Sequence, residues 1–341
     1  METRMLGNTG LAVSEFALGT MTFGDRTDEE TAFRMMDRYA EAGGSLIDTA
    51  DIYNLGASEE IVGRWLASRT DEAEDMVLAS KARFGTGERF GPNSRGYGRK
   101  QLHESLDGSL RRLGVDAIDL YQLHAWDPLT PISEALRFLD DAMAAGKIHA
   151  YGFSNFTGWQ ITKAVYEARL HGWAEPASIQ PQYSLLVRET ESEIMDAADD
   201  AGMAVLPWSP LAGGWLSGKY TKDDEPDTES RFAGRVANLQ SSWEERNRDP
   251  RTWRVLAELE RIGTERGASI PQVALAWTAA QPCVTSVILG ARTLKQLEEN
   301  LGASGLRLTA TELDALGRLS APQLTEYPYG RPALEQRSRE V

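Results

Sequence analysis

Four polar residues of the chain lie at or just after the ends of successive apolar runs: Asp48, Tyr53, Lys81 and His124. A lysine ammonium near a tyrosine stabilises phenolate over phenol, which lowers the pKa of the phenol and makes it an effective general acid. An aspartate such as Asp48 would pair with the buried lysine. A histidine beside them could hydrogen-bond the oxygen that the tyrosine protonates and stabilise an oxyanion there. These residue types therefore predict proton donation to a substrate oxygen.

Each of the four also has an ordinary structural explanation. Tyr53 is one of ten tyrosines, and a tyrosine commonly packs its ring and leaves its hydroxyl at the surface. An aspartate after a strand is commonly a turn or cap residue, a lysine can be solvated, and a histidine can be a packed core residue. Their joint placement after consecutive apolar runs favours a site over these explanations.

The elements that would position these residues are predicted by the hydrophobic pattern, in which short apolar runs alternate with longer amphipathic stretches. Eight such units in 341 residues predict an α/β fold, a (β/α)8 TIM barrel forming one domain over residues 1–341. A doubly wound sheet is disfavoured because no G-x-G-x-x-G follows any expected strand. The strands are expected at residues 16–19, 45–47, 76–80, 118–123, 149–153, 177–180, 203–207 and 285–289.

Segments outside the eight units carry their own signals. Gly7-Asn8-Thr9-Gly10 lies between two short strand patterns and predicts an N-terminal β-hairpin that plugs the bottom of the barrel. Residues 84–98 and 209–249 are too long for ordinary turns, and they follow strand ends, where barrels place their active sites. Residues 321–341 are expected to wrap the surface or the pocket mouth.

Helix starts are indicated by a threonine with Glu or Gln three residues later, the capping-box pattern. This pattern predicts that the threonine side chain caps the helix in each case. The pairs are Thr27 with Glu30, Thr293 with Gln296, and Thr309 with Glu312.

Composition excludes several classes of function. A net charge of −15 and a pI near 4.9 would repel phosphate backbones and anionic lipid surfaces, so neither nucleic-acid nor membrane partners are expected. The single cysteine, Cys283, allows no intrachain disulfide and is interpreted as structural. No apolar signal-peptide core and no run of about 18 apolar residues is present. A cytoplasmic location is therefore expected.

Several strings along nearly the whole chain resemble the aldo-keto reductase family, especially the branch of potassium-channel β-subunit-like and bacterial members. The tetrad of that family corresponds to Asp48, Tyr53, Lys81 and His124. The resemblance implies an NADPH-dependent oxidoreductase that reduces aldehydes and ketones to alcohols by hydride transfer, with Tyr53 as general acid. The matching strings are LGTMTFG at 18–24, IDTADIY at 47–53, LASK at 78–81, IDLYQLH at 118–124, YGFSN at 151–155, WSPLAGGWLSGKY at 208–220 and LGARTLKQLEEN at 289–300.

The resemblance also implies a set of cofactor contacts. The carboxamide would be hydrogen-bonded by Ser154, Asn155 and Gln180, and Trp208 would pack on the nicotinamide ring. Residues after the last strands would hold the adenosine end, and two basic residues of the long loop would clamp the pyrophosphate. The full set is Gly19, Thr20, Met21, Asp48, Ser154, Asn155, Gln180, Trp208, Ser209, Pro210, Leu211, Gly213, Lys219, Arg231, Gly290, Arg292, Gln296, Glu299 and Asn300.

The phosphate end can also be argued from the residues themselves. Gly290-Ala291-Arg292 leads into a helix expected to be capped by Thr293, so free backbone N–H groups and the positive helix end would face an anion. Arg292 can hold a phosphate with two parallel hydrogen bonds, which favours the 2′-phosphate of NADPH over the ribose of NADH. The alternative is an ordinary capped surface helix with a solvated Arg292.

Three aromatic residues after strands, Phe23, Phe84 and Trp126, are expected to wall the substrate pocket, with packing at the rim as the alternative. Such walls favour apolar or aromatic aldehydes. Two other functions of the chain were considered: the first stays open, and the second is disfavoured. A cofactor-sensing regulatory protein of the channel-subunit type would keep the same motifs. A hydrolase or lyase barrel is disfavoured because no metal-ligand cluster and no nucleophile-base pair is found at the strand ends. No metal is expected, and the sequence does not indicate an oligomeric state.

Overall fold

The structure is a computed structural model that describes residues 1–86, 91, 93–222 and 237–323. Two expectations fall outside these residues. One is the contact of Arg231 with a cofactor, and the other is the course of residues 321–341 from residue 324 onward.

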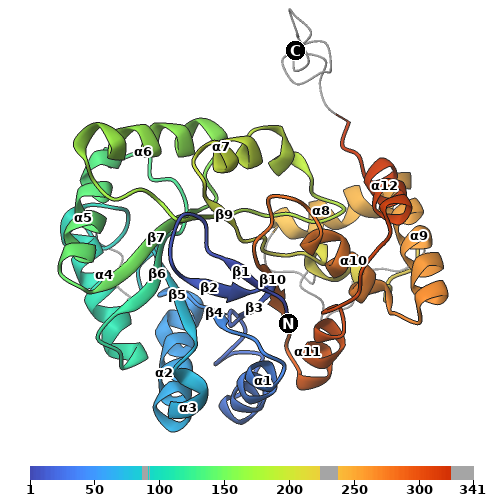
Figure 1. Ribbon diagram of the computed structural model, residues 1–341, viewed down its shortest axis with the longest axis horizontal. Helices are drawn as coiled ribbons and strands as arrows, with labels where there is room; N and C mark the ends of the chain where they lie inside the picture. The colour runs from blue at the N-terminus through green and yellow to red at the C-terminus, as the bar shows by residue number, and fades with distance from the viewer. Residues whose placement is uncertain (87–90, 92, 223–236, 324–341) are drawn as a thin grey trace, which may run out of the picture.

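Eight parallel strands form one sheet in the order β10-β3-β4-β5-β6-β7-β8-β9. The sheet closes because Thr285 N donates to Val205 O at 2.9 Å and Ile288 N donates to Pro207 O at 2.9 Å, which joins β9 to β10. The expected (β/α)8 barrel is confirmed, and each of the eight expected runs overlaps one of its strands (Figure 1). The strands are β3 (Phe16–Gly19), β4 (Leu46–Asp48), β5 (Val77–Ala82), β6 (Ile118–Leu123), β7 (Ile148–Ser154), β8 (Ser178–Gln180), β9 (Ala204–Val205) and β10 (Val287–Gly290).

Helices surround the strands and bury one apolar face against them (Figure 1). In the described residues no helix is long and apolar enough to cross a membrane. The α-helices are α1 (Glu29–Glu41), α2 (Ala57–Ser68), α3 (Thr70–Ala73), α4 (Arg99–Leu113), α5 (Ile132–Ala144), α6 (Gly158–His171), α7 (Ile194–Asp200), α8 (Ala237–Arg248), α9 (Pro250–Arg266), α10 (Ile270–Ala279), α11 (Leu294–Leu301) and α12 (Ala310–Leu319), and the 3-10 helices are η1 (Tyr53–Gly56), η2 (Glu189–Ser192) and η3 (Ala212–Ser217).

The N-terminal hairpin pairs β1 (Thr3–Met5) with β2 (Ala12–Ser14) in antiparallel register. Leu6 and Val13 are fully buried among apolar side chains of the barrel strands, such as Leu46, Leu120 and Ile288. Gly7 has φ +56°, and a Cβ there would lie 2.3 Å from the carbonyl oxygen of Ala177, just before β8. The hairpin therefore closes the end of the barrel where the strands begin, as the sequence predicts.

Helix caps agree with the sequence in part. The pair Thr309 and Glu312 forms a capping box, as expected. The prediction for Thr27 is wrong: α1 is capped by Asp28, which accepts from Thr31 N at 2.8 Å. Asp28 is the N-cap because it directly precedes the first residue of α1, whereas the Thr27 hydroxyl donates to Arg292 O at 3.0 Å.

The two long segments after β5 and β9 lie at strand C-terminal ends, as expected. The second is not an irregular loop throughout, because it contains the helices η3 and α8. Trp243 of α8 packs against Trp215 of η3 and against Tyr220, with ring centroids 4.4 and 4.6 Å away. This aromatic cluster anchors α8 to the barrel.

Candidate active site

The four predicted catalytic side chains meet at the C-terminal end of the barrel. Asp48 is the last residue of β4, Lys81 lies in β5, and His124 directly follows β6. Tyr53 begins η1, in the turn after β4. Because β4, β5 and β6 are hydrogen-bonded neighbours, residues far apart in the sequence are brought to one place.

Lys81 is the centre of this group, and its side chain is fully buried. Its Nζ donates to Asp48 Oδ2 at 2.7 Å, to Thr49 O at 2.8 Å and to the Tyr53 hydroxyl at 3.3 Å. Burial acts to lower the pKa of Lys81, but the charges of Asp48 and Tyr53 and their hydrogen bonds outweigh it, so the pKa lies above its usual value. The site therefore holds an ammonium ion against the phenol of Tyr53.

Tyr53 is oriented by an unusual backbone turn. Asn54 and Leu55 both adopt left-handed conformations, with φ of 49° and 56°. Such conformations are costly for residues other than glycine and persist where the surroundings hold them. The side-chain amide of Asn54 donates to Met21 O at 3.2 Å and to Phe23 O at 2.6 Å, which fixes the turn. The Lys81 Nζ also lies 4.9 Å from the centroid of the Tyr53 ring.

His124 lies beside Tyr53 in an edge-to-face contact, with ring centroids 5.9 Å apart. Burial, with smaller effects of Lys81 and Arg83, lowers the pKa of His124 to about 3. The imidazole is therefore neutral at physiological pH. Its Nδ1 is buried without a hydrogen-bond partner among the described residues, and the side chain lines the main cavity. A buried unpaired ring nitrogen of this kind is expected where a substrate or cofactor supplies the partner.

Asp48 is held on its other oxygen as well. Gln180 Nε2 donates to Asp48 Oδ1 at 2.8 Å, and Gln122 Nε2 reaches the same oxygen at 3.3 Å. Gln122 was not predicted from the sequence. The period-2 pattern of β6 could have identified it, because Gln122 lies two residues before His124 and alternate residues of a strand face the same side.

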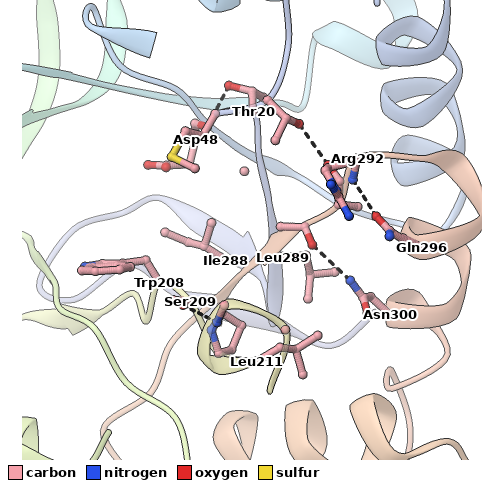
Figure 2. Close-up of a pocket in the computed structure, with 18 of the residues that line it drawn as sticks. Thr20, Asp48, Trp208, Ser209, Leu211, Ile288, Leu289, Arg292, Gln296 and Asn300 are labelled. Carbon is pink, nitrogen blue, oxygen red and sulfur yellow. Dashed lines mark hydrogen bonds between the residues drawn. The ribbon is translucent and has the colours of Figure 1, made fainter. Parts of the chain in front are cut away.

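A cavity of about 590 Å3 opens at this end of the barrel, between the tetrad and the start of α11. Figure 2 shows Arg292, Gln296 and Asn300 on one side of it and Trp208 on the other. Every predicted cofactor residue that the structure describes lines the cavity. Further lining residues that the sequence analysis did not select are Thr22, Gly214, Ser217, Pro271, Leu275, Ile288, Leu289 and Ala291.

The side chains expected at the carboxamide end form a connected set. Ser154 Oγ donates to Gln180 O at 2.9 Å, and Trp208 Nε1 donates to Asn155 Oδ1 at 3.1 Å. Asn155 is in a left-handed conformation with φ 55°, and its amide donates to His124 O at 2.9 Å. The turn after β7 is thereby tied to His124.

At the opposite end the chain passes from β10 into α11. Thr293 caps this helix by accepting from Gln296 N, while Gln296 Oε1 accepts from Arg292 N at 2.9 Å. The predicted capping box is thus only half formed, because the Gln296 side chain accepts from the backbone of Arg292 and not from that of Thr293. A Cβ on Gly290 would meet no protein atom within 4 Å, so the space beside the strand end is open to a ligand.

The family of this chain is shown by its similarity to known proteins. Residues 15–321 match the model of the aldo/keto reductase family. The chain belongs to this family. It is 39% identical over 314 residues to YrpG of Bacillus subtilis (strain 168), which is described as an uncharacterized oxidoreductase. The matched region covers 90% of this chain and 92% of that protein. Accordingly, the chain is an oxidoreductase of a family that uses nicotinamide cofactors and acts on small carbonyl compounds.

Two further relatives of this aldo-keto reductase differ in their described roles. A protein of Oryza sativa subsp. japonica, described as a probable voltage-gated potassium channel subunit beta, is 36% identical over 306 residues, covering 89% of this chain and 91% of its own. A norsolorinic acid reductase of Emericella nidulans is 32% identical over 315 residues, covering 89% of this chain and 77% of its own.

The aromatic residues expected to wall the substrate pocket of this aldo-keto reductase lie in different places. Phe23 is fully buried in the hydrophobic core, and, like Phe84 and Trp126, it is not among the residues that line the cavity. Phe84 packs edge-on against His124, with centroids 5.1 Å apart. Trp126 packs against Phe156 and the exposed Trp159, with ring centroids at 5.3 and 5.4 Å. Phe84 remains the candidate nearest to the catalytic group.

Among the described residues no group of three or more His, Cys, Asp or Glu side chains could hold a metal ion.

Proposed function

We propose that this protein is an NADPH-dependent reductase of aldehydes and ketones, with Tyr53 as the general acid. One observation carries the proposal. The Tyr53 hydroxyl lies 3.3 Å from the Nζ of a fully buried lysine, and Tyr53 lines a cavity of about 590 Å3. A phenol in contact with a buried ammonium can release its proton to a substrate oxygen and remain stabilised as phenolate.

Each member of the tetrad then has a role. Tyr53 gives its proton to the carbonyl oxygen, and Lys81 stabilises the phenolate that is left. Asp48 keeps Lys81 charged and in place through the 2.7 Å ion pair. His124, neutral because burial depresses the pKa of its ring, hydrogen-bonds the carbonyl oxygen and orients the substrate.

The residues present fit a dinucleotide. The Nδ1 of His124, which has no hydrogen-bond partner among the described residues, and the open space beside Gly290 belong to one cavity. The nicotinamide, when bound, supplies the hydride that no protein side chain can supply. Ser154, Asn155 and Gln180 would hold the carboxamide end, and the start of α11 would hold the phosphates.

NADPH is preferred to NADH in this proposal because Arg292, at the cavity wall before α11, can grip a 2′-phosphate. Gln296, Glu299 and Asn300 line the same part of the cavity. A cytoplasmic location fits the single cysteine of the chain and the predominance of acidic residues. The small-molecule partner would be an apolar or aromatic carbonyl compound, supported by the contact of Phe84 with His124.

A second function is favoured by the channel-subunit relatives. On that alternative the protein binds a nicotinamide cofactor and serves as a regulatory sensor. The experiment that separates the two mixes purified protein with NADPH and a panel of aromatic and aliphatic aldehydes, and follows the loss of nicotinamide absorbance. Enzymatic function predicts substrate-dependent oxidation of NADPH. Tight NADPH binding without turnover of any aldehyde would favour the sensor.

A further inference from the structure

The segment Thr20–Thr27, between β3 and α1, contacts both ends of the proposed dinucleotide site. On one side, Thr22 Oγ1 donates to Ala291 O at 3.1 Å, and Thr27 Oγ1 donates to Arg292 O at 3.0 Å. These two carbonyls belong to the turn that leads into α11. Thr27 is almost fully buried, and its one hydroxyl hydrogen has two acceptors within reach, Arg292 O and Thr22 Oγ1, both at 3.0 Å, so the hydroxyl bonds inside the protein rather than to water.

On the other side, the segment holds the turn that carries Tyr53. Asn54, the next residue, donates from its amide to Met21 O and Phe23 O at 3.2 and 2.6 Å. Asn54 is in a left-handed conformation, which asparagine tolerates better than most residues. These two bonds hold the Tyr53 turn to this segment.

The segment itself is cross-braced. Phe23 N donates to Thr20 O at 3.0 Å, Thr27 N to Thr22 O at 3.0 Å, and Gly24 N to Thr27 O at 2.9 Å. The side chain of Phe23 is fully buried in the core beneath these bonds. A displacement at one end is therefore expected to reach the other, because little of the segment can bend independently.

Fixing a carbonyl also fixes the N–H on the far side of the same peptide plane, because the peptide is planar. Thr22 and Thr27 thus orient the N–H groups of Arg292 and Thr293. The first of these donates to Gln296 Oε1, and the second lies at the N-terminus of α11, where an anion would be held.

We propose that the segment Thr20–Thr27 couples the phosphate-binding turn to the Tyr53 turn, so that Thr22, Thr27 and Asn54 are positioning residues for cofactor and acid. The proposal rests on the proposed function, since it assigns the turn before α11 to a dinucleotide phosphate. Thr22 and Thr27 act on affinity for the cofactor. Asn54 acts on the rate of proton donation by Tyr53.

The test compares hydroxyl removal with hydroxyl retention in the full-length protein. Thr27→Val is expected to raise the Kd for NADPH, measured by quenching of tryptophan fluorescence, by about fivefold, the effect of one hydrogen bond. Thr27→Ser keeps the hydroxyl and is expected to stay within about twofold of the parent. Thr22→Val and Thr22→Ser, at a half-buried position, give a second matched pair if Thr27→Val folds poorly.

Asn54→Asp keeps the size and the left-handed tendency of the residue but removes the amide donor. It is expected to lower kcat by about tenfold and, through the segment, to raise the NADPH Kd by about threefold, a larger effect on rate than on affinity that general loss of structure would not produce. In the double variant Asn54→Asp with Thr27→Val, the fold-loss in kcat/KM for NADPH should be smaller than the product of the two single fold-losses. The reason is that both substitutions break the same connection between the two turns.

The outcomes are distinguishable. If the parent protein binds no NADPH, the proposed function and this coupling both fall. If the parent binds and turns over but the valine variants bind NADPH as tightly as the serine variants, the coupling is overturned while the proposed function stands. Strictly multiplicative losses in the double variant would also overturn it.

Discussion

Replacing Lys81 by methionine would test the electrostatic design of the site. The variant keeps the length of the side chain but removes the ammonium, and leaves the Asp48 carboxylate buried without its ion-pair partner at 2.7 Å. Removing one partner of a buried pair costs about 3–5 kcal/mol of unfolding free energy. We expect about 3 kcal/mol here, the lower end, because Gln180 and Gln122 still donate to Asp48 Oδ1.

The matched control is the double variant Asp48→Asn with Lys81→Met, which removes both charges. It should recover about 1–2 kcal/mol of the loss, since no unpaired charge stays buried. The folded pKa of Lys81 is raised, so the pair contributes its full stability below the ordinary lysine pKa and loses it only as pH rises through the folded value. Urea unfolding at neutral pH is the assay. A double variant as unstable as Lys81→Met, or a stable single variant, would refute this reasoning.

Three further outcomes are expected. Burial, and after it the charge of Glu59, raises the pKa of Asp51 to about 7. Because the unfolded chain ionises at lower pH than the folded protein, the parent loses unfolding free energy as pH rises from about 4 to about 7. Asp51→Asn should avoid this loss and gain up to about 4 kcal/mol of unfolding free energy relative to the parent over this interval, measured by urea unfolding. His124→Gln should remove stability loss between about pH 6.5 and 3, because the depressed pKa of the histidine makes the unfolded chain bind that proton first; an unchanged pH profile of unfolding would count against this assignment. Arg292→Ala should raise the Kd for NADPH by about tenfold or more and that for NADH by about twofold at most in fluorescence titrations, whereas equal increases would contradict the 2′-phosphate role.

The barrel could be predicted from the sequence because its strands are short apolar runs at regular intervals, and the side chains proposed to be catalytic could be placed because they follow those runs. Lys81 shows how far the ends of strands can be predicted from apolar runs. The expected strand stops at Ser80, but β5 continues to Ala82, so Lys81 lies inside the strand and is fully buried. Burial of a lysine is decided by its partner Asp48, 33 residues away in the sequence.

Residues in loops were harder to place. Thr27 carries a local capping signal with Glu30, yet its hydroxyl contacts Arg292, which is 265 residues away along the chain. Phe23 was expected in the pocket wall, and nothing periodic in a turn indicates which way one side chain points. The helix α8 within the long connection depends on packing of Trp243 against Trp215, which no local pattern reveals.

The proposed function depends above all on proton donation by Tyr53. The most direct measurement is the rate of NADPH oxidation by Tyr53→Phe with saturating aromatic aldehyde, together with its NADPH Kd, against Tyr166→Phe at an exposed tyrosine of α6 as control. If Tyr53 is the general acid, Tyr53→Phe should lose at least about a hundredfold in kcat, with an NADPH Kd within about twofold of the parent. A Tyr53→Phe variant that reduces the aldehyde at the rate of the Tyr166→Phe control would contradict it.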